Sequence, residues 1–315
     1  MLLHLTKLHL SILCLLLVMC LHGTAYGAND DGAADLGVDY AFMSLMTLSP
    51  DFAAANYTIH NEGGLDVDIS MGRLPYHLDL MKNLEYRLQL EVALAYQRTK
   101  EVIPTSPTPG ENVDAEWDTY GAGLGLLYIN NISKQLQFTP SLRVGLAKME
   151  NHARYNGVLA NLYKDLFDGV LFNWETNASV VNLGLGLSYT WKLIDRYSSI
   201  KADVYHIYVD SFAESNVAVR FSEHANMLAV KADMVFPTDV TIRGDRLDLV
   251  LLLGANNFFG ENRRTLGYTT SYQAGIGAEF PLKWGQTTYG HLRLSGQVLW
   301  APNMEGWLLT IGFNP

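Results

Sequence analysis

A regular alternation of apolar and polar residues over residues 84–97 constrains the fold of this chain more than any other feature. Every even position from Leu84 to Tyr96 is apolar, and most odd positions are polar or small. A period of two is typical of a β-strand, because successive side chains of a strand point to opposite faces. At about 14 residues, the stretch exceeds a soluble strand of about 5–6 residues and suffices for a tilted membrane strand of about 9–11. It therefore predicts a strand that crosses a membrane.

The same alternation recurs along the chain and predicts twelve strands. Before residue 84 it is less regular, over about 53–61 and 65–80. The second of these segments contains Pro75 and a change of phase, which predicts a bulged or bent strand. The segments that follow 84–97 are 120–128, 136–146, 181–191, 200–208, 228–236, 247–255, 268–280, 292–300 and 307–313.

The connections between these segments alternate in length. The short ones, after even-numbered strands, are 81–83, 130–133, 192–198, 238–245 and 283–290. The long ones, after odd-numbered strands, are 98–116, 149–177, 210–225 and 256–267, and the exceptions are short connections near 61–64 and 301–305. Short turns on one rim and long loops on the other are typical of bacterial outer-membrane barrels. We therefore expect an all-β protein, a 12-stranded antiparallel transmembrane β-barrel, with a short surface helix near 155–169.

Aromatic residues on the apolar faces gather at the ends of the predicted strands, and Tyr272 is the one clear departure. Two aromatic girdles that flank an aliphatic band match the two interfaces of a bilayer. At the loop rim the residues are Tyr96, Tyr120, Tyr208, Tyr268, Trp300 and Trp307. At the turn rim they are Tyr86, Tyr128, Phe138, Tyr189, Trp191, Phe236, Phe280 and Phe313.

We interpret residues 1–27 as a cleaved signal peptide. Lys7 precedes an apolar stretch of about 14 residues, too short to cross a bilayer, and small residues occupy positions −3 and −1 of the expected cleavage site. Both cysteines, Cys14 and Cys20, lie in this segment, so the expected mature chain has no disulfide and no cysteine-based site. A lipoprotein at Cys20 is the alternative, but Met19 precedes it where a small residue is preferred.

Residues 28–50 form a separate N-terminal segment ahead of the barrel, which we assign to residues 51–315. Within this segment, 33–48 carries a loose helical stripe that Pro50 ends. It could be a plug, a periplasmic arm or an extra strand, and we favour a place in the lumen. Without the signal peptide the chain has 21 basic and 32 acidic residues, a net charge of −11, which argues against binding to nucleic acid.

Over about residues 50–315 the sequence resembles the translocator barrel of autotransporters, and more narrowly the solitary outer-membrane barrels of that class that carry no passenger. The resemblance implies that the barrel assembly machinery recognises the last strand, 307–313. The residues of this assembly signal are Trp307, Leu309, Ile311 and Phe313. Two departures are that Asn314 and Pro315 follow the strand and that Leu308 stands where the family prefers Gly. The N-terminal segment is too short for a secreted passenger.

The polar faces of the predicted strands would line the lumen and carry charges of both signs. Such charges are expected to pair across the lumen, because an unpaired charge in a confined space is costly. This favours a salt-bridged core that stiffens a narrow barrel. A hydrophilic channel for small solutes is the functional alternative, and the mixed signs do not favour ion selectivity. The candidate lumen-lining residues are Glu85, Arg87, Glu91, Arg143, Lys201, Asp203, Lys231, Asp233, Asp248, Glu279 and Arg293.

A barrel hydrolase, phospholipase-like or protease-like, is the alternative function. The motifs Asp-Val-Asp at 66–68 and His-Leu-Asp at 77–79 are similar to catalytic pairs of outer-membrane proteases, but both lie on one predicted strand. A phospholipase-like site needs His and Ser facing lipid on adjacent strands. By phase His206 faces lipid, whereas Ser188 and Ser295 face the lumen. The histidines show no metal-ligand spacing and no phosphate loop is present, so we expect no metal and no cofactor.

We therefore expect a monomeric, non-enzymatic outer-membrane protein of a Gram-negative bacterium. It would be a narrow pore, or a structural barrel whose surface loops meet partners. Its expected surroundings are outer-membrane lipid and lipopolysaccharide, with the assembly machinery as a partner during biogenesis.

Overall fold

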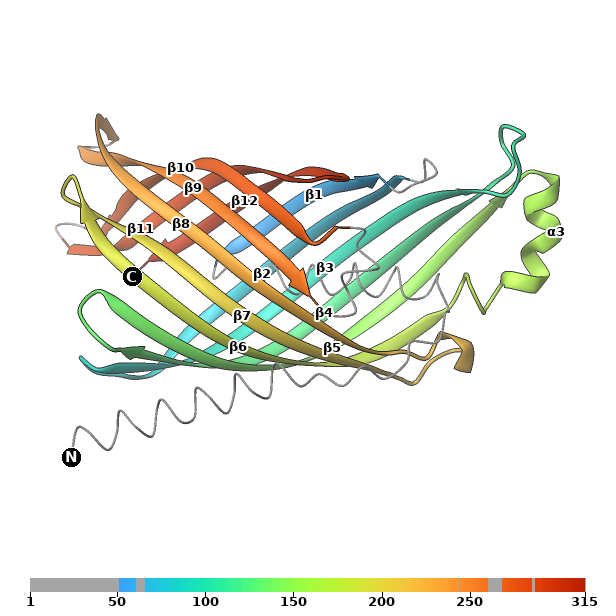
Figure 1. Ribbon diagram of the computed structural model, residues 1–315, viewed down its shortest axis with the longest axis horizontal. Coiled ribbons are helices and arrows are strands. Elements are labelled where there is room, and N and C mark those ends of the chain that lie inside the picture. Colours follow the sequence, from blue (N-terminus) through green and yellow to red (C-terminus); the bar gives the residue numbers. More distant parts are fainter. Residues whose placement is uncertain (1–50, 61–65, 243, 260–267, 285–286, 315) are drawn as a thin grey trace. The chain divides into compact units, whose positions relative to one another are not determined.

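Twelve antiparallel strands form a closed barrel in the computed structural model, which describes residues 51–60, 66–242, 244–259, 268–284 and 287–314 (Figure 1). Each strand pairs with its neighbours in sequence, and β1 pairs with β12 to close the barrel. The prediction of a 12-stranded antiparallel barrel is confirmed. The strands are β1 Phe52–His60, β2 Asp66–Lys82, β3 Tyr86–Pro104, β4 Asn112–Asn131, β5 Leu136–Asn156, β6 Glu175–Leu193, β7 Arg196–Phe212, β8 Ser222–Ile242, β9 Asp245–Phe259, β10 Thr270–Trp284, β11 Thr287–Ala301 and β12 Met304–Asn314.

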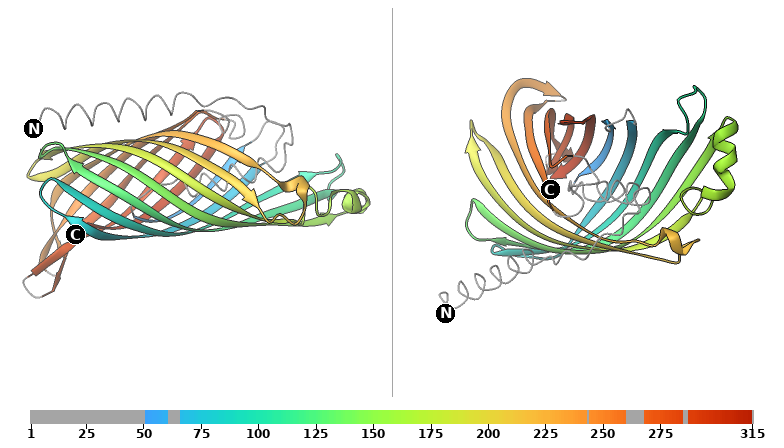
Figure 2. Two further views of the ribbon diagram at one scale, coloured as in Figure 1. Left: turned by 90° about the horizontal axis from the view of Figure 1, so that it is seen from below. Right: turned by 45° about the vertical axis from the view of Figure 1, so that its right-hand side comes forward.

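Several strands are longer than predicted, and β3, β4 and β5 extend towards helix α3 (Val158–Phe167) (Figures 1 and 2). β3, β4 and β5 have 19, 20 and 21 residues, so the loop predicted at 98–116 is strand except for residues 105–111. The prediction was wrong because the outward side chains become charged beyond the aromatic girdle, which hides the alternation. These charges pair between strands, as Arg98 Nε does with Asp118 Oδ1 at 2.9 Å. The inward side chains, such as Val113 and Trp117, stay apolar and buried.

The opposite rim carries the short turns that the sequence predicts. Ile194 and Asp195 join β6 to β7 with φ angles of 44° and 63°, as in a two-residue hairpin turn whose twist matches the strands. In β2 the register shift falls between Asp79 and Met81 rather than at Pro75, which pairs in register with Ala93. The pairing of β1 with β2 ends at Arg73, before Pro75. The absence of an N–H group on Pro75 therefore costs no hydrogen bond to β1.

Two short helices lie in the loops among the described residues. Helix α3 (Val158–Phe167) follows β5 and confirms the helix predicted near 155–169, and a 3₁₀-helix spans Val217–Val219. No helix in the described part of the chain is long and apolar enough to cross a membrane. The predictions for the signal peptide and for residues 28–50 lie outside the described residues.

The outer face of the barrel is an exposed apolar band with aromatic pairs towards its edges. Leu94, Leu124 and Leu142 are among the exposed aliphatic residues. The aromatic pairs are Tyr96–Tyr120 at 5.1 Å, Tyr86–Tyr128 at 5.6 Å and Tyr272–Trp300 at 5.9 Å between ring centroids.

One girdle residue was wrongly assigned from the sequence. Tyr268 is buried inside the barrel and packs edge-on against Phe258, with ring centroids 5.8 Å apart. The reason is that β10 begins at Thr270, so Tyr268 precedes the strand and does not follow its phase. Tyr272, the departure from the predicted girdles, pairs with Trp300 and fills the girdle position that was predicted for Tyr268.

Candidate functional site: the barrel lumen

The inward face of the barrel has two zones that the sequence did not separate. Ion-paired side chains gather in a charged layer. A second zone, the apolar chamber, is walled by buried aromatic and methionine side chains nearer the loop rim. The charged layer consists of Arg73, Glu91, Arg143, Lys201, Asp203, Asp233, Asp248, Glu279 and Arg293, with Arg196 at its edge.

One half of the charged layer is built on Glu91 of β3. Arg73 Nη2 lies 2.8 Å from Glu91 Oε1, and Arg143 Nε lies 2.9 Å from the same oxygen. Arg73 and Glu91 are only 4% and 3% exposed. Arg143 reaches Glu91 from β5 by lying flat over β4 at Gly125, where an added Cβ would be 2.9 Å from Arg143 Cγ. His77 Nε2 lies 3.3 Å from Glu91 Oε2 and completes the group.

The other half of the charged layer is built on Arg293 of β11. Its Nη2 lies 2.7 Å from Glu279 Oε2 on β10, and its Nη1 lies 2.5 Å from Asp233 Oδ2 on β8. Arg196, at the start of β7, bonds to Asp248 on β9. Every guanidinium of this half therefore has a carboxylate partner.

These ion pairs run along the barrel wall. Among the described residues, the inward ion pairs join strands at most three apart in the barrel order. The inward charges are paired as expected, but the pairs join nearby strands and not opposite walls. Antiparallel register already places opposite charges within reach on nearby strands, and small residues such as Gly125 let long side chains lie flat between them.

The remaining candidate lumen residues occupy different positions. Glu85 is exposed in the turn before β3, so its assignment to the lumen was wrong. Arg87 lies at the start of β3, with its Nε 3.9 Å from Asp79 Oδ1. Arg73 and Arg196 were missed. The first could have been found by carrying the alternation of Val67, Ile69 and Met71 through the irregular second strand.

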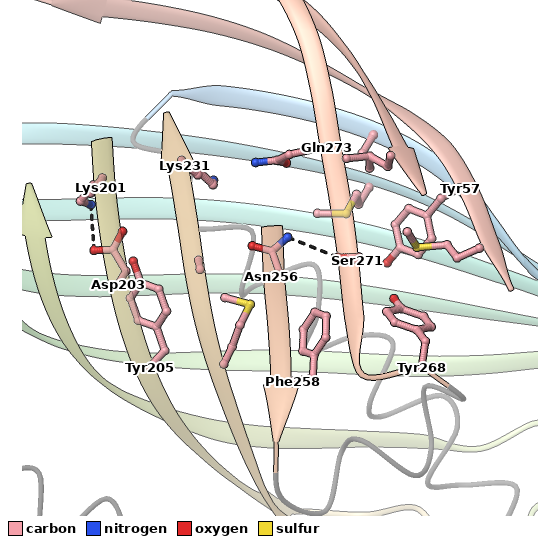
Figure 3. A pocket seen from close by; sticks show the side chains of 16 residues that line it. Tyr57, Lys201, Asp203, Tyr205, Lys231, Asn256, Phe258, Tyr268, Ser271 and Gln273 are labelled. Carbon is pink, nitrogen blue, oxygen red and sulfur yellow. Dashed lines mark hydrogen bonds and ion pairs between the residues drawn. The ribbon is translucent and has the colours of Figure 1, made fainter. Parts of the chain in front are cut away.

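Figure 3 shows the apolar chamber, a cavity of about 100 Å³. Lys201, Asp203 and Lys231 stand on one side of it, and Asn256, Ser271 and Gln273 add polar groups. The apolar residues that line it include Tyr57, Met71, Met227, Phe258, Tyr268 and Met304. The chamber was not predicted from the sequence, because the expected lumen was defined by its polar residues alone. The inward run Ala225, Met227 and Ala229 on β8 was the available signal.

The structure does not assemble either hydrolase site. His206 Nδ1 lies 2.8 Å from Asn226 Oδ1 on the outer face. The strand partners of His206, however, are Leu183 and Asn226, and Ser295 is buried on the inner face. The acidic pair at 66–68 lies at the other end of β2 from the His-Leu-Asp motif. In the described part of the chain, no group of three or more His, Cys, Asp or Glu residues could hold a metal.

Outside the lumen, Glu111 caps helix α3. Its carboxylate accepts hydrogen bonds from the backbone N–H groups of Val158, Leu159 and Ala160 at 2.9, 2.8 and 3.3 Å. Desolvation alone would raise the pKa of Glu111, but these three hydrogen bonds outweigh it and hold the pKa below its usual value. The cap fixes the helix to the loop between β3 and β4.

Helix α3 also presents an exposed apolar stripe. Val158, Leu162 and Leu166 are 80%, 71% and 66% exposed, at a spacing of four residues that places them on one side of the helix. We call these three residues the α3 stripe.

A closed barrel with an apolar outer band and a polar inner layer defines an outer-membrane β-barrel protein. More narrowly, the chain belongs to the family of solitary outer membrane autotransporter β-barrel domains, whose model matches residues 62–283. This confirms the resemblance drawn from the sequence and places the protein in a Gram-negative outer membrane.

The barrel is also similar to solved autotransporter domains. The β domain of the Bordetella autotransporter BrkA has a TM-score of 0.51 and is 13% identical, with 84% of this chain and 98% of that chain covered. The translocator domain of NalP from Neisseria meningitidis has a TM-score of 0.52 at 11% identity, with coverages of 88% and 92%. The transport unit of AIDA-I from Escherichia coli has a TM-score of 0.52 at 8% identity, with coverages of 91% and 100%. At these identities the likeness shows the fold alone. No curated protein matches the chain.

Proposed function

We propose that this barrel is a non-enzymatic, narrow polar passage through the outer membrane for small solutes. The observation that carries the proposal is the course of the inward ion pairs, which lie along the wall and join strands at most three apart. A core built to fill the barrel would instead link opposite walls. Paired charges of both signs also make the wall hydrophilic. They should not make the passage select strongly between cations and anions.

Single-channel recording in planar bilayers tests the passage. The folded protein is expected to give discrete conductance steps with little preference between cations and anions. Protein boiled before addition is the control and should give none. The absence of resolvable steps, from a sample whose unboiled form migrates as a folded barrel on a denaturing gel, would contradict the proposal.

A second candidate function is a contact surface at the loop rim, and the α3 stripe favours it. Three large aliphatic side chains exposed on one side of a capped helix are unusual where no partner covers them. Cells that carry the double variant L162K/L166K should adhere less to an apolar surface than cells with the wild-type protein. The matched control is Lys164→Gln, a polar change on the same helix, and equal adherence of all three would contradict this role.

We also propose that the barrel is not a hydrolase. His206 and Asn226 lie together on the outer face, but the strand positions beside them supply no serine nucleophile. Incubation of folded protein with phospholipid and peptide substrates is expected to give no turnover. Turnover that is lost in a His206→Ala variant would overturn this proposal.

A further inference from the structure

We propose that the apolar chamber binds a small carboxylate with an apolar tail, held at its carboxylate by Lys231 with Lys201 beside it. The inference rests on the proposed passage, since it names the class of solute that the lumen would take. Lys231 has no ion-pair partner among the described residues, Gln273 is directed towards it, and the cavity beside it is small and lined mostly by apolar side chains (Figure 3).

Two cations face each other in this part of the wall. Lys201 on β7 and Lys231 on β8 are direct partners in the antiparallel register. Like charges placed opposite each other on one face of a sheet destabilise the pair. An anion between the two ammonium groups would turn this repulsion into attraction. The barrel therefore keeps a cation pair that becomes favourable when an anion is bound.

Three carboxylates, Asp51, Asp203 and Asp233, lie near enough to interact electrostatically with Lys231, but none of them forms an ion pair with it. Asp203 Oδ1 lies 3.0 Å from Lys201 Nζ, and Asp233 is bonded to Arg293. Within the part of the chain that the structure describes, Lys231 Nζ has no hydrogen bond and no ion pair. An ammonium in a partly buried place without such a partner is costly, which makes it the natural anchor for a ligand carboxylate.

Gln273 adds a polar group beside this anchor. Residue 254 on β9, the strand partner of both Lys231 and Gln273, is glycine. A Cβ at that position would lie only 2.3 Å from Gln273 Nε2, so the amide side chain lies over the glycine. In Figure 3 its end is directed towards Lys231. Its N–H₂ group can donate a second hydrogen bond to a bound carboxylate.

The rest of the chamber suits an apolar tail of limited size. Tyr57, Met227 and Phe258 supply aromatic and thioether surface, which packs well against a ring or a short chain. The cavity of about 100 Å³ is of the order of an engineered apolar cavity of about 150 Å³ that binds benzene. The chamber therefore matches a single ring or a short alkyl chain rather than an oligosaccharide or a peptide.

Equilibrium binding of benzoate to the folded protein in detergent tests this site independently of conduction. Benzoate should bind more tightly than acetate, which lacks the tail, and more tightly than benzylammonium, which reverses the charge. Lys231→Met should weaken benzoate binding by roughly tenfold or more, as expected for a lost charge-assisted hydrogen bond. The matched control is Lys134→Met, which removes an exposed lysine from the turn between β4 and β5 and should leave binding unchanged.

Lys231→Met removes a like-charge contact, so the variant is expected to fold, and heat-modifiable migration checks this. Equal benzoate binding by the wild type and K231M, or equal binding of benzoate and benzylammonium, would overturn the site. In that case single-channel conductance, measured separately, would still decide the passage. Conversely, lysine-dependent benzoate binding by a protein without conductance would support the site and contradict the passage.

Discussion

At the scale of single residues, the charged layer depends on how two arginines share one carboxylate. Glu91 is buried between Arg73 and Arg143, and the geometry holds because Gly125 leaves room for the Arg143 side chain. Taking a guanidinium out of water is costly unless a carboxylate meets it. The carboxylate of Glu91 is therefore worth more to the barrel than any exposed ion pair on its outer face.

Glu91→Gln should destabilise the folded barrel. The substitution leaves the buried guanidinium of Arg73 and the partly buried one of Arg143 without their carboxylate, and breaking a buried ion pair in this way costs about 3–5 kcal/mol. The measurement is the free energy of unfolding in denaturant, from a protein folded in lipid.

The control for this substitution is Glu116→Gln. Glu116 pairs with Arg98 and Lys100 on the outer face above the girdle, where the side chains are partly exposed. Its loss should cost less than about 1 kcal/mol. Equal losses for the two variants would show that the charged layer is no more important than surface pairs.

The sequence predicted most of these residues but not their partners. The alternation placed Glu91, Arg143 and Arg293 on the inward face, because period two depends only on phase. Which charge meets which depends on strand register and on the space above Gly125, and neither can be obtained from one strand alone. Arg73 was missed because the apolar residues of β2 change from the inward face, at Met71, to the outward face, at Leu74, which looks like a change of phase in the sequence although the strand pairs continuously there.

At the scale of elements, strands were predicted better than the hairpins beyond the membrane. Inside the bilayer one face must be apolar, so the alternation is strong. Beyond it, outward residues such as Arg98 and Asp118 form cross-strand ion pairs, and the strand continues without an apolar face to mark it. The apolar chamber was missed for a different reason, because its inward apolar side chains, such as Met227 on β8, carry no polar signal.

The attachment of helix α3 should depend on pH. The folded-state pKa of Glu111 is depressed below its ordinary value of 4.5, so its capping stabilisation is present above that value and is lost as the pH falls through the folded-state pKa. Hydrogen exchange of the Val158, Leu159 and Ala160 amides, corrected for intrinsic rates, measures this. Protection should be lower in Glu111→Gln at neutral pH and should converge with the wild type in acid.

Glu214→Gln provides the control for this pH dependence. Glu214 lies in the loop after β7 and accepts a hydrogen bond from Ser211, so its loss should leave the amides of α3 unchanged. If wild type and Glu111→Gln show the same protection at every pH, the carboxylate does not hold the helix.

We propose that β12 carries the assembly signal, since Trp307, Leu309 and Phe313 are all exposed on its outward face. Phe313→Ala should reduce the fraction of protein assembled in the outer membrane, measured by heat-modifiable migration of envelope fractions. Phe259→Ala, an outward phenylalanine on β9, is the control. Equal assembly of both variants would contradict the proposal.

At the scale of the whole molecule, fold and family were predictable because strand number, connection length and girdles are properties of the entire chain. The function of the lumen could not be predicted from the sequence. Inward charged residues such as Glu91, Arg143 and Arg293 are compatible both with a core that fills the barrel and with a wall around an open passage. The proposal of an open wall rests on the ion pairs, which join nearby strands.

The central claim is that the lumen is a water-filled passage, and paired cysteine variants test it most directly. Ser141 faces inward in contact with Arg143, and its neighbour Leu142 faces outward. Each is replaced by cysteine in a background where Cys14 and Cys20 are serine. A charged thiol reagent added during single-channel recording should lower the conductance of the Ser141→Cys barrel in a single step and leave the Leu142→Cys barrel unchanged. An unchanged Ser141→Cys barrel, or no conductance at all, would contradict the passage.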